Sequence, residues 1–140
     1  QLLPGYESMQ SLSEVFAALK GQVTYIDLWA TWCVPCRAEL QYSIKLHDTL
    51  KTLGVQTVYI SIDVENADKK WREMIQQLPL KGINLRTNNE LHKDVSKVIP
   101  KFTGIPRYLI LDKTGNVVEW DAKRPSDNLD LIRQLKTYLN

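Results

Sequence analysis

The fold of this chain is decided by the segment Asp27-Leu28-Trp29-Ala30-Thr31-Trp32-Cys33-Val34-Pro35-Cys36-Arg37-Ala38-Glu39-Leu40. Residues 23–29, which run into this segment, are mostly β-branched or aromatic and include no glycine or proline, which is typical of a buried strand. Beyond the cysteines, leucine and isoleucine recur at helical spacing as far as residue 53, and Gly54 ends the pattern. A strand therefore leads into a long helix, and two cysteines lie at the junction.

The two cysteines lie where a thiol is most reactive. Pro35 suits the first turn of a helix, because the amide hydrogen that it lacks would have no intrahelical acceptor there. Cys33 then lies at a helix N-terminus, where unpaired amides and the helix dipole both stabilise a thiolate. Cys36 follows one turn later, close enough to form a disulfide with Cys33. We expect Cys33 to attack a substrate disulfide and Cys36 to resolve the mixed disulfide that results.

Other roles for two cysteines fit the sequence less well. A structural zinc site needs four ligands, and the remaining candidates, His47 and His92, lack the spacing of a zinc finger. A disulfide framework needs several bridges between distant segments. Two structural thiols that happen to lie three residues apart are the remaining alternative. The setting of strand, CxxC with an internal proline, and helix favours a redox pair, with no metal and no cofactor besides the disulfide itself.

The rest of the chain alternates between helical and strand-like patterns. Helices are expected over residues 11–20, 34–53, from Asn66 or Asp68 to 77, over 92–99, and from Ser126 or Asp127 to 139. Strands are expected over residues 23–29, 55–62, 107–111 and 117–120, and residues 83–85 could make a further short one. Strands separated by helices pair in parallel, whereas the final tight hairpin is antiparallel. The sequence predicts one α/β domain over residues 1–140, with a mixed central sheet and helices on both faces.

Composition and charge narrow the range of partners. The chain has 140 residues, of which 44% are hydrophobic and 24% charged, and its formal net charge is +2. Because the charges are scattered, neither nucleic acid nor a membrane surface is indicated as a partner, and a monomer is the default. The longest apolar runs reach about seven residues, against roughly 18 for a bilayer-spanning helix. No direct membrane insertion by this segment is expected.

The segment quoted first resembles the active-site segment of the thioredoxin superfamily, and within it that of the TlpA/ResA-like oxidoreductases of bacterial cell envelopes. The resemblance extends over about residues 11–140. It implies a thioredoxin-like fold with an N-terminal extension. It also implies a thiol–disulfide oxidoreductase that acts as a reductant and uses only its own disulfide. The partners implied are protein thiol or disulfide substrates and an upstream redox partner.

The same resemblance implies a location. It indicates the periplasm or cell envelope of a bacterium, and the cytoplasm is the less favoured alternative, since a CxxC pair alone does not fix the compartment. The chain starts at Gln1 without an initiator methionine. We therefore expect a processed product, or the C-terminal domain of a longer anchored protein.

A proline loop near residue 105 is the next feature that the resemblance covers. Gly104-Ile105-Pro106 is similar to the cis-proline loop of the family, which implies a cis Ile105–Pro106 bond beside the disulfide. In the family the backbone before this proline pairs with an extended substrate. Arg107 stands where the family often has threonine, and we expect it to alter the charge preference for substrates.

Further contacts with substrate are expected beside the cysteines. Trp32 flanks Cys33 and is expected to line an apolar substrate surface, together with Val34 and Pro35. The dipeptide between the cysteines differs from the Gly-Pro of thioredoxins. Gln41 replaces a helix-kinking proline that is usual in the family, so that the helix is expected to be straighter.

Two acids have both a functional and a structural interpretation. Asp27 matches the buried acid that relays protons for the resolving cysteine in thioredoxins, and burial would raise its pKa. Its alternative is a hydrogen-bonded polar residue at the edge of the strand. Glu39 resembles the active-site glutamate of the envelope subgroup, which affects proton transfer. Its alternative is a first-turn acid that interacts favourably with the helix dipole.

Two rival functions remain. A redoxin-type peroxidase would use a peroxidatic cysteine in a loop rich in threonine and proline, which this sequence does not contain. A non-catalytic binding module could use the same fold as a scaffold, because a fold does not fix a function. The intact CxxC and the Pro106 loop argue against the second rival.

Overall fold

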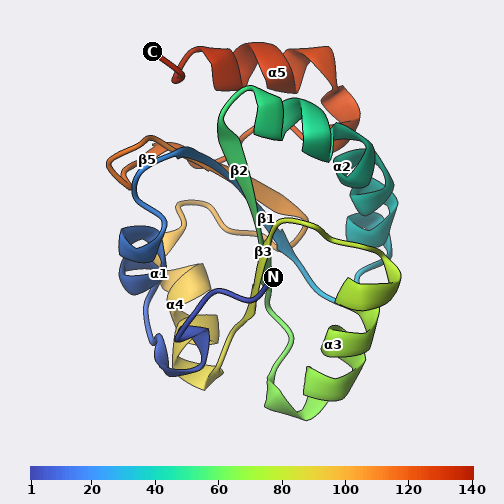
Figure 1. The fold of residues 1–140 in the computed structure, drawn as a ribbon. Helices are drawn as coiled ribbons and strands as arrows, with labels where there is room; N and C mark the ends of the chain where they lie inside the picture. Colours follow the sequence, from blue (N-terminus) through green and yellow to red (C-terminus); the bar gives the residue numbers. More distant parts are fainter.

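The computed structural model describes residues 1–140 as a five-stranded sheet covered by helices on both faces (Figure 1). The strands are β1 (Val23–Trp29), β2 (Val55–Ser61), β3 (Ile83–Arg86), β4 (Arg107–Leu111) and β5 (Val117–Glu119). The α-helices are α1 (Leu12–Ala18), α2 (Val34–Thr52), α3 (Asp68–Gln77), α4 (Asn89–Val98) and α5 (Leu129–Lys136). Short 3-10 turns precede three of them: η1 (Tyr6–Ser8), η2 (Glu65–Ala67) and η3 (Pro125–Asp127).

The sheet is mixed and has the strand order β3-β2-β1-β4-β5. β1 pairs in parallel with β2, and β2 with β3, because a helix connects each of these strands to the next. β4 runs antiparallel to both β1 and β5. The central strand β1 is buried along its whole length, which explains its nearly continuous run of apolar and β-branched residues. The fold class predicted from the sequence is confirmed, and the short strand considered over residues 83–85 is β3.

Two buried clusters fill the layers beside the sheet. The larger one has 24 residues and extends from α1 and α4 through the sheet to the first turns of α2. The smaller one has 9 residues and lies between the sheet, the end of α2 and α5. In Figure 1, α1 and α4 cover one face of the sheet, and α2, α3 and α5 lie on the other. None of these helices combines the length and apolar character needed to cross a bilayer.

The start of α3 differs from the prediction. Neither Asn66 nor Asp68 caps this helix: its N-cap is Ala67, which makes no side-chain hydrogen bond to the first turn. The Asp68 carboxylate instead forms ion pairs with Arg72 at 2.8 Å and Arg86 at 2.9 Å. The local pattern predicts Asp68 as a helix cap, but its carboxylate is engaged in a tertiary ion pair with Arg86.

The start of α5 differs in the same way. Ser126 and Asp127 lie in η3, and α5 begins only at Leu129, after Asn128 has turned the chain with a φ of 51°. The helix ends at Lys136, short of the predicted residue 139. The consequence for the site is that η3 is placed against α2.

Candidate active site

Cys33 and Cys36 form a disulfide at the start of α2. Cys33 is the N-cap residue of the helix, and the Cys36 amide donates a hydrogen bond to its Sγ at 3.3 Å. The two residues are 5% and 1% exposed, so that Cys36 is the deeper one. After reduction the same amide can donate to the Cys33 thiolate, which is a charge-assisted bond and favours ionisation of this thiol.

Two exposed apolar side chains flank Cys33 in the sequence. Trp32 is 62% exposed and Val34 is 65% exposed, although both are large and apolar. A groove of about 460 Å³ continues from Val34 between α2 and α3, past Gln41 to Met74 and Leu78. α2 itself is unbroken at Gln41. The disulfide therefore lies beside exposed apolar side chains and next to a groove that the polar side chains of Arg37, Gln41 and Gln77 also line.

The loop before β4 completes the site. The Ile105–Pro106 peptide bond is cis, as the family resemblance implies. The carbonyl oxygen of Ile105 lies 3.9 Å from Cys33 Sγ. This is a van der Waals contact, since a disulfide sulfur carries no proton to donate. The fold thus brings together two segments that are about 70 residues apart in the sequence.

Arg107 does not have the role expected from the sequence. It is only 9% exposed, and its guanidinium donates to the carbonyl oxygens of Pro100, Lys101 and Trp120 at 2.8 to 3.0 Å. A side chain held in this way faces the interior of the loop and not the surface that a substrate would approach. The prediction that Arg107 sets a charge preference is not supported by its position.

Asp27 lies on the central strand and is 1% exposed. It is in register with Tyr59 of β2 and Tyr108 of β4, and Tyr59 contacts Ser43 of α2 through its hydroxyl. Because paired residues point to the same face, Asp27 faces the side that α2 covers. Neither of its carboxylate oxygens has a hydrogen-bond partner among the protein groups, and Asp27 lies within the paired part of the central strand. Burial, with a smaller contribution from the charge of Glu39, raises the pKa of Asp27 well above its usual range.

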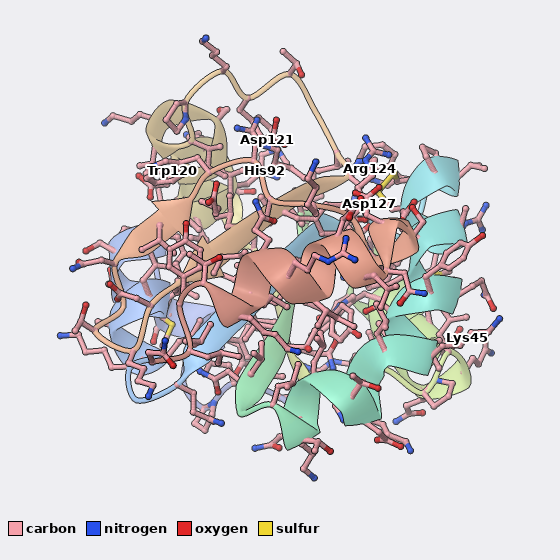
Figure 2. The ribbon with its side chains drawn as sticks, turned by 90° about the horizontal axis from the view of Figure 1, so that it is seen from above. Lys45, His92, Trp120, Asp121, Arg124 and Asp127 are labelled. Atoms are coloured by element: carbon pink, nitrogen blue, oxygen red, sulfur yellow. A yellow bond between two sulfur atoms is a disulfide. The ribbon has the colours of Figure 1, made fainter.

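Glu39 joins the first turns of α2 to η3. Its carboxylate accepts hydrogen bonds from the backbone amide of Ser126 at 2.9 Å and from the Ser126 hydroxyl at 2.7 Å. Figure 2 shows Arg124 and Asp127, which flank this contact, at the end of α5 nearest to α2. The side chain is therefore committed to a structural contact, while its charge is felt at Asp27.

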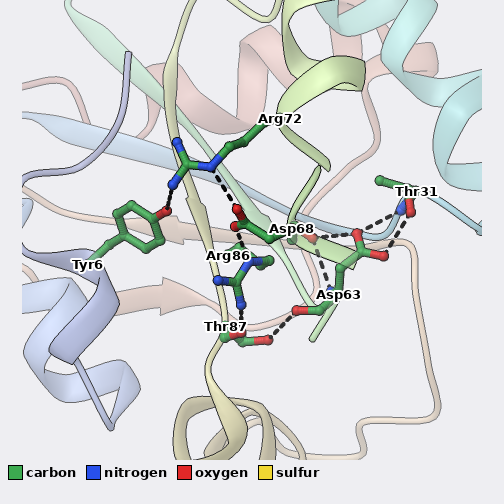
Figure 3. A network of polar contacts seen from close by, with 8 residues as sticks. Tyr6, Thr31, Asp63, Asp68, Arg72, Arg86 and Thr87 are labelled. Atoms are coloured by element: carbon green, nitrogen blue, oxygen red, sulfur yellow. Dashed lines mark hydrogen bonds and ion pairs between the residues drawn. The ribbon is translucent and has the colours of Figure 1, made fainter. Parts of the chain in front are cut away.

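A buried polar cluster, which was not predicted from the sequence, holds Thr31 in place two residues before Cys33. The carboxylate of Asp63, just beyond β2, accepts hydrogen bonds from the amide and hydroxyl of Thr31 and from the hydroxyl of Ser61 (Figure 3). The Thr87 hydroxyl donates to the backbone carbonyl of Asp63, and Arg86 donates to that of Thr87. The position of these residues in the sequence could have predicted the cluster. Thr31, Asp63 and Thr87 each follow one of three neighbouring parallel strands, and such residues meet at one edge of the sheet.

No group of three or more His, Cys, Asp and Glu side chains is placed so that it could hold a metal ion. His47 and His92 belong to no such group with the cysteines. His92 Nδ1 lies 3.0 Å from the carbonyl oxygen of Ile62, and His47 Nδ1 is buried without a partner. The redox group that the structure does contain is the disulfide.

Comparison with known proteins agrees with this geometry. The chain is 30% identical over 101 residues to the thiol-disulfide oxidoreductase ResA of Bacillus thuringiensis subsp. konkukian, an alignment that covers 71% of the chain and 54% of ResA. A Bacteroides vulgatus protein named as a candidate thiol-disulfide oxidoreductase has a solution structure with a TM-score of 0.71 and 32% identity, covering 88% of this chain and 75% of that one. The chain spans about half the length of the curated relatives it matches.

A further solved structure supports the fold alone. The thiol:disulfide interchange protein of Chlorobium tepidum TLS, a thioredoxin family protein, has a TM-score of 0.68 at 24% identity and covers 89% of this chain and 84% of that one. The fold and the cysteine pair define a thioredoxin-superfamily protein of the TlpA/ResA-like type. Within that class the chain belongs to the Redoxin family, whose model matches residues 7–132.

Proposed function

We propose that this protein exchanges its dithiol and disulfide with protein substrates and acts as a reductant. The observation that carries the proposal is the Cys33–Cys36 disulfide at the N-terminus of α2, with the Cys36 amide directed at Cys33 Sγ. The name of the ResA relative, thiol-disulfide oxidoreductase, supports the same chemistry. The disulfide needs no other redox group for this reaction.

The exchange takes two steps. The Cys33 thiolate attacks one sulfur of a substrate disulfide, forms a mixed disulfide and releases the other substrate sulfur as a thiolate, which takes up a proton. The Cys36 thiolate then attacks Cys33 Sγ, closes the protein disulfide and releases the second substrate thiol. Two electrons pass from the protein to the substrate. An upstream dithiol partner must return them before the next cycle.

The neighbouring residues have proposed roles in these steps. Asp27, buried and without a partner, is the candidate to accept the proton of Cys36, because a carboxylate with a raised pKa is a better base at neutral pH. Glu39 adjusts this proton transfer through its charge at Asp27. Trp32, Val34 and Pro35 form one side of the substrate contact.

The other side of the contact is the proline loop. Ile105 and Pro106 lie beside the disulfide, where an extended substrate could pair with the backbone by strand addition. We place the reaction in the bacterial periplasm or cell envelope, on the resemblance to ResA-like proteins. Fractionation of the native host with an antibody to this chain tests the location, and recovery in the cytosol alone would contradict it.

The reduction potential of the Cys33–Cys36 couple tests the direction. The protein is equilibrated with thiol–disulfide buffers of known potential, and the reduced fraction is read by alkylation and mass spectrometry. We expect a value near or below about −250 mV, as for thioredoxin. A value above about −180 mV would indicate an oxidant or isomerase. A pair that cannot be cycled would leave only the binding-module alternative.

A trapping variant tests the substrate class. Cys36→Ser retains the attacking thiol and lacks the resolving one, so mixed disulfides with protein clients should accumulate and be released by dithiothreitol. Cys33→Ser is the matched control and should trap none. Consumption of hydrogen peroxide by the reduced protein at a rate rivalling its disulfide exchange would favour the redoxin-type peroxidase.

A further inference from the structure

We propose that Arg107 is a positioning residue that holds the proline loop, residues 100–106, in place beside the disulfide. The inference rests on the proposed function, since it concerns how the loop is presented to a substrate. Arg107 is the first residue of β4 and follows cis Pro106 directly. Its backbone pairs with Leu28 of β1, which anchors this end of the loop in the sheet.

The guanidinium reaches back to the beginning of the loop. Nη2 donates to the Pro100 carbonyl at 2.9 Å and Nη1 donates to the Lys101 carbonyl at 3.0 Å. The side chain of the residue that ends the loop thus binds the two residues that begin it. These two hydrogen bonds close the seven-residue loop at its base. Ile105, whose carbonyl oxygen contacts Cys33 Sγ, lies close to this base in the sequence.

A third bond ties this closed loop to the neighbouring strand. Nε of Arg107 donates to the Trp120 carbonyl at 2.8 Å, just beyond β5, and the Asp121 carboxylate lies 3.5 Å from the same atom. Figure 2 shows Trp120 and Asp121 in the segment that follows β5. Because the guanidinium is planar and presents its donors in a fixed fork, one side chain fixes three carbonyl groups at once.

The conformation at Lys101 explains why the loop needs holding. Lys101 has a φ of 52°, in the left-handed region that a residue with a side chain seldom adopts. Such a turn persists only when its surroundings hold it, and the bond from Nη1 to the Lys101 carbonyl does so. A loop held in advance can pair with an extended substrate without first being ordered.

Two matched probes distinguish an effect on pairing of the substrate with the proline loop from an effect on the reactivity of the cysteines. One is Ellman's reagent, 5,5′-dithiobis(2-nitrobenzoate), a small disulfide. The other is an extended peptide with one cysteine capped by the same nitrothiobenzoate group. In both reactions the Cys33 thiolate of the reduced protein displaces one nitrothiobenzoate thiolate and forms a mixed disulfide with the rest of the probe. Cys36 then attacks Cys33 Sγ, closes the protein disulfide and releases the second nitrothiobenzoate thiolate or the peptide thiol. Only the peptide can pair with the loop.

Arg107→Lys and Arg107→Gln are compared with the unsubstituted protein and with Arg133→Gln, an exposed arginine of α5 paired only with Asp130. We expect the rate constant for the peptide to fall about tenfold in both Arg107 variants, and that for Ellman's reagent to stay within about twofold. Lysine should not rescue, because one ammonium cannot bind three carbonyls. Arg133→Gln should change neither rate.

Three results would overturn the inference. The first is full activity of Arg107→Lys with the peptide, which would show that a positive charge suffices. The others are an equal fall of the rate constants for both probes, and no fall for either probe. Should Arg107→Gln not fold, the test is Arg107→Lys with Lys101→Gly. Glycine adopts φ near +52° readily, so this pair should recover about threefold over Arg107→Lys alone, and no recovery would contradict the role at Lys101. An unsubstituted protein that reacts with neither probe would refute the proposed function itself.

Discussion

Glu39 and Ser126 are joined by two hydrogen bonds, through which a carboxylate in the first turns of α2 binds the backbone and the hydroxyl of η3. The two residues are 87 positions apart in the sequence. The contact fastens the segment before α5 to the helix that carries the cysteines. It also keeps a negative charge close enough to Asp27 to raise the pKa of that buried acid.

Replacement of Glu39 by alanine should lower the free energy of unfolding by about 1 kcal/mol, because two charge-assisted bonds at a partly exposed position are lost. Ser126→Ala removes one of the two bonds and should cost less. The double variant should cost about as much as Glu39→Ala alone, since both changes remove the same contact. Urea unfolding at neutral pH measures all three, and strict additivity would show that the contact contributes nothing.

Asp27→Asn should stabilise the protein at neutral pH. The folded-state pKa of Asp27 lies above the unfolded value, so between these two values the native protein binds a proton that the unfolded chain does not. The stability of the parent protein therefore falls as the pH rises through this interval, and it is fully present only below the unfolded pKa of about 3.9. Asparagine carries no charge and removes this dependence.

Urea unfolding of the oxidised protein between about pH 4 and pH 8 tests this sign. The parent and Asp27→Asn should approach one another at the acidic end, and the variant should be more stable at the alkaline end. Asp130→Asn, an exchange of an exposed acid on α5, is the matched control and should follow the parent throughout. If Asp27→Asn lost stability relative to the parent as the pH rises, the raised pKa assigned to Asp27 would be contradicted.

Asp63→Ala should lower the free energy of unfolding by about 3 kcal/mol, because the Thr31 amide, the Thr31 hydroxyl and the Ser61 hydroxyl would be left buried without their acceptor. Asp63→Asn keeps acceptor capacity on one oxygen and should cost less. Thermal and urea unfolding of the oxidised protein measure the two losses. Equal stability of Asp63→Ala and the parent would mean that water replaces the carboxylate without cost.

Gly82→Ala should destabilise the protein by about 2 kcal/mol or more, because a Cβ at this position would collide with the backbone carbonyl oxygen of Thr57. Gly54→Ala is an informative comparison, since a Cβ there meets no atom and the cost arises only from a φ of 87°. We expect Gly82→Ala to show the larger fall in melting temperature. The opposite order would indicate that the loop before β3 moves aside easily.

Elements whose signals are local were predicted well from the sequence. β1 and β4 have the predicted bounds, because each is a buried run of strand-forming residues with clear limits. β1 is followed by a loop, and β4 begins directly after Pro106. Cys33 caps α2 as expected, since the CxxC and Pro35 define a helix start by themselves. Patterns within about ten residues carried this information.

Features that depend on distant partners could not be predicted in the same way. Asp68 and Ser126 both looked like helix caps, but one is paired with Arg86 and the other with Glu39, far away in the sequence. Arg107 was expected to alter the charge preference for substrates, yet its long side chain folds back on the loop that precedes it. The choice of partner for a polar side chain is decided by the packed fold, which local propensity does not encode.

The N-terminal extension lies along the outer edge of β3. Leu2 pairs with Asn84 in parallel, the Asn84 amide donates to the Gln1 carbonyl at 2.7 Å, and the Leu3 amide donates to the Asn84 carbonyl at 3.0 Å. These are the groups that a strand from a second molecule would need. The opposite edge is the short β5, whose pairing with β4 shifts in register. A sheet bounded in this way presents few free backbone groups at its edges for pairing with a strand of a second molecule.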